Sequence, residues 1–268
     1  IMIFGLFGCP AMGIRGAAAA TVIGQIAAMF LALYFNLKKN HDVSIDMRSF
    51  RPDARIIRII YSVGLPSIIM QSITSVMTYG MNLILISFSA TAVTVLGIYF
   101  KLQSFIFMPI FGLNNGMIPI IAYNYGARSK KRIMDTAKLS IAIAIGIMLL
   151  GLTIFQIFTP QLLMLFNASD SLLEMGIPAL RTISLSFLFA GYCIITGSVF
   201  QALGNGVYSL IISVARQLLC ILPLAYIFSH AWGLHAVWFA FPMAEIISTL
   251  LTSILFKRIY NKKIKVLE

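Results

Sequence analysis

Seven long and nearly uncharged runs of apolar residues limit most strongly how this chain of 268 residues can fold. A helix that crosses a bilayer needs about 20 mostly apolar residues, and each run is at least that long. The predicted spans are 16–37, 61–88, 92–124, 136–159, 172–202, 207–229 and 235–256. Membrane strands would be shorter and would alternate between apolar and polar residues. The runs therefore predict an all-α polytopic membrane protein, with residues 1–8 as the end of an eighth helix.

The composition supports this class and excludes others. Hydrophobic residues make up 60% of the chain and charged residues 10%, whereas an average soluble domain has about 25% charged residues. So few charges cannot cover the surface of a soluble domain of this size. A soluble enzyme, a disordered chain and a nucleic-acid-binding domain are therefore excluded. The three cysteines are isolated, which predicts neither a disulfide framework nor a zinc site.

The basic residues predict how the helices are oriented. Sixteen of the 20 Lys and Arg residues lie within 38–58, 128–138 and 257–265. An even number of predicted spans separates these segments, so all three lie on one side of the membrane. The opposite loops, 89–91, 160–171 and 230–234, contain no Lys or Arg. Because basic loops stay in the cytoplasm, we expect a multi-pass plasma-membrane protein with a cytoplasmic C-terminus. The net charge of +12 then reflects orientation and contacts with membrane lipid, not nucleic acid.

The two ends of the chain resemble each other. Residues 11–31 and 231–251 share five identities at an offset of 220, and both precede a basic segment. Such a repeat predicts two parallel lobes in a parent of twelve helices and roughly 440 residues. The predicted parts are the last helices of a truncated N-terminal lobe (1–37), a cytoplasmic inter-lobe linker (38–60), a six-helix C-terminal lobe (61–256) and a basic cytoplasmic tail (257–268).

Glu245 is the one acidic residue deep inside a predicted span, since Glu174 lies at the outer end of its own. An ionisable group at that depth is costly and marks a functional candidate. Arg216, at similar depth in the preceding antiparallel span, is its predicted partner. The two could form an ion pair that holds the helices together, or a switch that responds to a proton or cation. Lys101 and Arg181 could reach the membrane interface or line a cavity.

Polar residues are most frequent in the second and third predicted spans. Pro109 and Pro119 each remove a backbone hydrogen bond from the third span. Polar side chains at this depth either line a cavity or bond to neighbouring helices, and both interpretations stay open. The predicted cavity residues are Gln71, Asn82, Gln103, Asn114 and Asn115.

Motifs of the common enzyme classes do not occur in the sequence. It contains no HExxH, no GxSxG and no phosphate-binding Walker loop. His230 and His235 lie near each other, but no third metal ligand accompanies them. We therefore expect no enzyme activity, no catalytic residue, no resident cofactor and no metal site.

Six stretches resemble the MATE (multidrug and toxic compound extrusion) transporters, in particular the bacterial multidrug-export branch. They occur in family order: GAAAAT at 16–21, GLPS at 64–67, YNYGARSKKR at 123–132, FQALGNG at 200–206, RQ at 216–217 and WFAFPMAE at 238–245. The resemblance covers the whole chain. It implies that the chain runs from the end of the fifth helix of a twelve-helix transporter through the twelfth, as a C-terminal fragment.

The resemblance also implies a mechanism. Two six-helix lobes would surround a central cavity, with alternating access driven by transported Na⁺ or H⁺. Thr21 would lie near the cation site of the N-terminal lobe, and Arg216 and Glu245 would form a charge network. Thr74 and Ala190 are neutral near the acidic positions of one branch's C-lobe site, which argues against cation coupling of that kind. The implied function is antiport of small cationic amphipathic drugs by a protein monomeric at full length. The alternative is a flippase for lipid-linked saccharides, which has the same broad fold.

Overall fold

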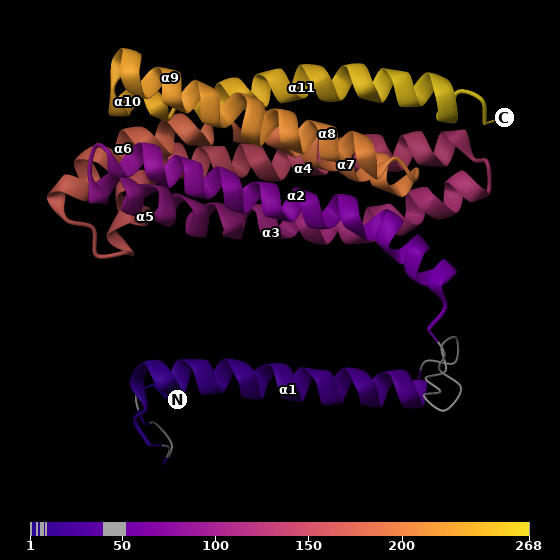
Figure 1. Ribbon diagram of the computed structural model, residues 1–268, viewed down its shortest axis with the longest axis horizontal. Helices are drawn as coiled ribbons and strands as arrows, with labels where there is room; N and C mark the ends of the chain where they lie inside the picture. Colours follow the sequence, from indigo (N-terminus) through magenta and orange to yellow (C-terminus); the bar gives the residue numbers. More distant parts are fainter. Residues whose placement is uncertain (1, 4, 6–7, 9, 40–51, 268) are drawn as a thin grey trace. The chain divides into compact units, whose positions relative to one another are not determined.

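The computed structural model describes residues 2–3, 5, 8, 10–39 and 52–267. Within these ranges the chain is helical and contains no strand, which confirms the all-α prediction. All seven predicted spans coincide with helices or with helices that follow one another directly. The chain divides into two units, Ile1–Ile57 and Arg58–Glu268, and each is described by itself (Figure 1).

The first unit contains α1 (Gly13–Lys39), which is long and apolar enough to cross a membrane. The N–H of Met12 donates to the carbonyl of Met2 at 3.1 Å, so a turn precedes the helix. A side chain at Gly16 would collide with that carbonyl. The predicted helix end at 1–8 lies partly outside the described residues, and Met2, Ile3 and Gly5 are in turns. Residues 40–51 of the predicted linker also lie outside them.

Among its described residues the second unit holds five candidate spans and one bent helix pair that makes a sixth if the pair counts as one span (Figure 1). They are α2 (Ala54–Ile86), which begins inside the predicted linker segment, α3 (Ala90–Gly126), α4 (Lys130–Ile157), the pair α6 (Asp170–Ser184) and α7 (Phe187–Ala202), the segment α8 (Gly206–Val214), η2 (Ala215–Ile221) and α9 (Leu222–Trp232), and the segment α10 (Leu234–Val237), α11 (Ala240–Ile259) and η3 (Tyr260–Ile264). The short α5 (Thr159–Met164) joins α4 to α6. The pair α6 and α7 bends by 48° at its junction.

Local sequence explains the tight connections between these spans. The Ser89 hydroxyl accepts a bond from the N–H of Ala92 at 3.1 Å, which caps the start of α3. Gly204 after α7 and Gly233 after α9 have φ values of 72° and 78°. This left-handed conformation suits glycine and ends a helix sharply. Short links of this kind keep consecutive helices adjacent and antiparallel.

Aromatic residues fill the core of the second unit. Phe155 on α4 contacts Phe187 on α7 edge to face, with ring centroids 5.2 Å apart. The ring centroid of Tyr99 on α3 lies 6.0 Å from that of Phe241 on α11. Tyr99 also meets Phe155 edge to face, with centroids 6.5 Å apart, so these rings join four helices around one interior. α3 stays continuous although Pro109 and Pro119 lie inside it, so the predicted loss of backbone bonds does not break the helix.

Lys263 ties the end of the chain to the rest of this unit. Its Nζ donates to the carbonyl of Leu203 at 2.8 Å and lies 5.7 Å from the ring centroid of Tyr125. Because Asn205 also donates to this carbonyl, we expect Lys263→Met to lower the free energy of unfolding by only about 1 kcal/mol. Thermal unfolding in detergent measures the loss. The exposed neighbour Lys262 is the control. An equal loss of unfolding free energy in Lys262→Met would show that the contact between Lys263 and Leu203 is not what stabilises the unit.

Candidate functional site

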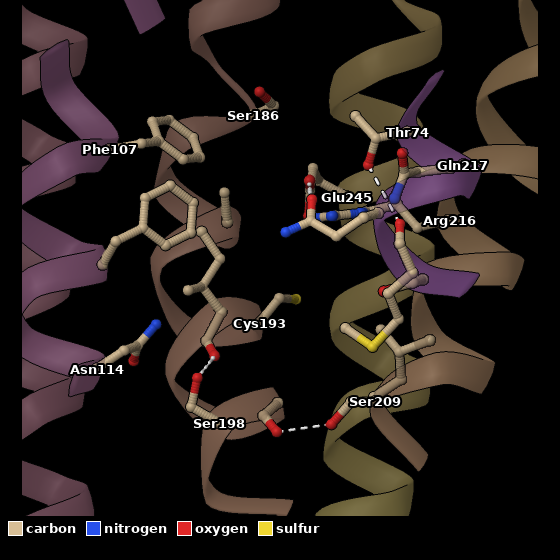
Figure 2. A pocket seen from close by; sticks show the side chains of 18 of the residues that line it. Thr74, Phe107, Asn114, Ser186, Cys193, Ser198, Ser209, Arg216, Gln217 and Glu245 are labelled. Carbon is tan, nitrogen blue, oxygen red and sulfur yellow. Dashed lines mark hydrogen bonds and ion pairs between the residues drawn. The ribbon is translucent and has the colours of Figure 1, made fainter. Parts of the chain in front are cut away.

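A cavity of about 590 Å³ lies inside the second unit (Figure 2). Small-molecule pockets typically measure about 300–1,000 Å³. Residues from α2, α3, α7, α8, η2 and α11 line it. Its apolar wall includes five aromatic rings, those of Tyr99, Phe100, Phe107, Phe111 and Phe241. Large rings beside polar groups can bind an amphipathic small molecule.

Four of the five predicted cavity residues line this pocket. They are Gln71 on α2 and Gln103, Asn114 and Asn115 on α3. The lining residues of α3 between Tyr99 and Ile118 recur about every three to four positions, so they share one helix face. Their role in binding stays a prediction.

Asn82 does not belong to the lining residues. It follows Gln71 by eleven residues, which puts it on the same face of α2 but about 16 Å further along the helix. The lining residues of α2 end at Met77. Asn82 therefore lies beyond the part of α2 that lines the pocket, and its role in binding stays a prediction.

Thr21 lies on α1, in the first unit. Its hydroxyl donates to the carbonyl of Ala17 in the same helix at 3.0 Å. Its role near a cation site stays a prediction. Lys101 and Arg181, for which a cavity position was left open, do not line the pocket.

Arg216 and Glu245 form the ion pair predicted from their depth. Arg216 Nη1 lies 2.9 Å from Glu245 Oε1 and joins η2 to α11. The Arg216 side chain is 23% exposed and the Glu245 side chain 10%. Figure 2 shows the Arg216 side chain extending toward the carboxylate of Glu245. Glu245 Oε2 is buried and has no hydrogen-bond partner among the described residues.

The segment that carries Arg216 is a π-helix, which was not predicted from the sequence. Pro223 follows η2 by two residues. Proline has no N–H, and its ring collides with the carbonyl four residues earlier, so a widened turn relieves the clash. Arg216 and its neighbour Gln217 both line the pocket. A proline inside an apolar span was the available signal, and π-helical turns often occur at functional sites.

The remaining chemistry of the site is limited. Cys193 lines the pocket as a free thiol, 3.3 Å from Thr249 Oγ1, and Cys220 is also free. In the described parts of the chain, no group of three or more His, Cys, Asp or Glu residues could hold a metal ion. The site therefore offers binding groups: one cation, one carboxylate, amides, hydroxyls and aromatic rings.

Comparison with known proteins identifies the family. The MatE family model matches residues 66–227. The chain is 27% identical over 263 residues to the "Multidrug export protein MepA" of Staphylococcus haemolyticus (strain JCSC1435), covering 98% of this chain and 57% of the relative. It is 28% identical over 248 residues to the protein of the same name from Staphylococcus aureus (strain N315), covering 91% and 53%. The chain thus spans somewhat more than half the length of these relatives.

Solved structures agree with the family match. A MOP superfamily transporter from Pyrococcus furiosus, described as having a binding pocket of reverse polarity, superposes with a TM-score of 0.87 at 26% identity. The match covers 99% of this chain and 59% of that one. An outward-facing multidrug resistance MATE transporter gives a TM-score of 0.88 at 26% identity, covering 99% and 60%. With the family model matching more than half of its residues, the chain belongs to the MatE family.

Proposed function

We propose that this chain is the C-terminal part of an exporter of small, cationic amphipathic drugs. Export would proceed by alternating access in the plasma membrane and would be coupled to Na⁺ or H⁺. The pocket carries the proposal: a cavity of about 590 Å³ combines aromatic rings with amide groups inside a bundle of membrane-spanning helices. The names of the relatives, which are multidrug export proteins, support the same activity.

The finer parts of the proposal rest on the sequence. The basic segments favour a cytoplasmic C-terminus, and the family resemblance favours a monomeric full-length protein with a cation site near Thr21. The alternative, a flippase for lipid-linked saccharides, is not favoured. Among the described residues that line the pocket, Arg216 is the one cation, and Glu245 already neutralises it.

Ethidium efflux from cells that express the complete reading frame tests both transport and coupling. We expect efflux to stop when a protonophore and removal of Na⁺ abolish the ion gradients. Efflux that continues without either gradient would contradict coupling to these ions. Cells without the gene give the background rate.

A pair of phenylalanines on α3 tests the pocket itself. Phe111 lines the pocket, whereas Phe105 is 73% exposed and does not line it. Losing apolar contact with a substrate changes rates by about tenfold or more. We therefore expect Phe111→Ala to slow ethidium efflux about tenfold, with Phe105→Ala close to the unmodified protein at equal expression. Equal rates in the two variants would place substrate binding elsewhere.

A further inference from the structure

Arg216 and Glu245 are the two charged residues among the described residues that line the pocket. They contact each other through one pair of atoms, Nη1 and Oε1. A guanidinium has five N–H donors, so further donors remain on Arg216, whose side chain is partly open to the cavity. Glu245 Oε2 accepts no hydrogen bond from the described residues. Each member of the pair can therefore bind a second group.

Charge balance decides which ligand can use both residues. The pair itself is neutral, so a ligand with a single positive charge that binds Glu245 leaves the pocket with a net positive charge. A ligand with a single negative charge that binds Arg216 leaves it with a net negative charge. An unpaired charge in apolar surroundings is strongly unfavourable. A zwitterion avoids both costs, because one ion pair is exchanged for two and the pocket stays neutral.

The surroundings of the pair suit such a ligand. The planar guanidinium matches a carboxylate, with which it forms two parallel hydrogen bonds. An ammonium has three donors, and Gln217 beside Arg216 adds a buried Oε1 that has no partner among the described residues. Phe107 lies across the pocket from Arg216 (Figure 2) and, with Phe100 and Phe241, lines an apolar wall.

We infer that Arg216 and Glu245 form a subsite for zwitterions that carry an aromatic body. The acid group binds the guanidinium of Arg216, the ammonium binds the carboxylate of Glu245, and the ring lies against the aromatic wall. The inference rests on the proposed function, since it assumes that small molecules enter this pocket. It adds zwitterions to the cationic drugs proposed above, and it holds that zwitterions bind this pocket more tightly than cations do.

Four derivatives of one compound test the charge preference. 3-(2-Naphthyl)-L-alanine is the zwitterion, its methyl ester the cation, its N-acetyl form the anion and its N-acetyl methyl ester the neutral control. At pH 6 the amines are protonated and the acids ionised. Calorimetry measures binding to the purified 268-residue chain in detergent. We expect the zwitterion to bind at least tenfold more tightly than each of the others.

If the cation, the anion or the neutral form binds as tightly as the zwitterion, the proposed subsite is wrong. Absence of binding by all four would overturn it as well. Because the unmodified chain is used, these outcomes do not depend on whether a variant folds. Ethidium efflux tests the exporter separately, so equal binding of the four derivatives alongside gradient-driven efflux would refute the subsite alone.

The double variant Arg216→Gln/Glu245→Gln tests whether these two residues cause the tighter binding of the zwitterion. It removes both charges while keeping polar side chains of similar size. We expect the zwitterion to lose at least tenfold in affinity, and the neutral derivative to change by less than threefold. Lys101→Gln, in a span but not lining the pocket, should retain the full preference. A preference that survives in the double variant would overturn the assignment to Arg216 and Glu245.

Discussion

Replacing Arg216 with methionine is expected to lower the free energy of unfolding by about 3–5 kcal/mol. The change leaves the Glu245 carboxylate 10% exposed and without its cation. A buried charge that has lost its partner is far less stable than either the intact pair or a fully apolar contact. For this reason Arg216→Met/Glu245→Met should recover most of the loss.

Thermal unfolding of the purified variants in detergent measures this effect. Asp170→Asn is the control, because Asp170 is an exposed acid at the start of α6. We expect the control to unfold close to the unmodified chain, and Glu245→Gln to be clearly less stable than the control. Equal, small losses in Arg216→Met and Asp170→Asn would show that the ion pair does not hold η2 to α11.

Gly191→Leu is expected to disrupt the contact between α7 and α4. A Cβ at Gly191 would lie 3.3 Å from the backbone C and O of Ala144 and 3.1 Å from Met148 Cγ. Membrane helices use small residues to bring backbones this close. The backbone of Ala144 cannot rotate away as a side chain can. Overpacking costs about 1–3 kcal/mol, and we expect the leucine to reach the upper end of that range.

Gly146→Leu supplies a matched control on α4. Gly146 is exposed, and a Cβ there meets no atom within 4 Å. Size-exclusion chromatography after heating reports the fraction of chain that stays monodisperse. This fraction should fall for Gly191→Leu, less for Gly191→Ala, and not for Gly146→Leu. A monodisperse Gly191→Leu with unchanged unfolding would contradict the close contact.

The ion pair shows how far sequence reasoning can reach in a membrane protein. Apolar surroundings make an isolated charge costly, so Glu245 required a partner, and Arg216 was the cation at the same depth in the adjacent span. The short link between their spans made the helices neighbours. Asn82 shows the limit of this reasoning. Helical periodicity gives the face of a side chain, but the end of a cavity depends on residues from other helices.

By itself, the sequence determined the helical spans, their connections and the ion pair between Arg216 and Glu245. These features follow from local physics, because a bilayer requires about 20 apolar residues for a spanning helix and a partner for a buried charge. Only the tertiary structure decided the bend between α6 and α7 and the set of side chains that share one cavity. Those features depend on how six helical segments pack against one another, and no single segment encodes that packing.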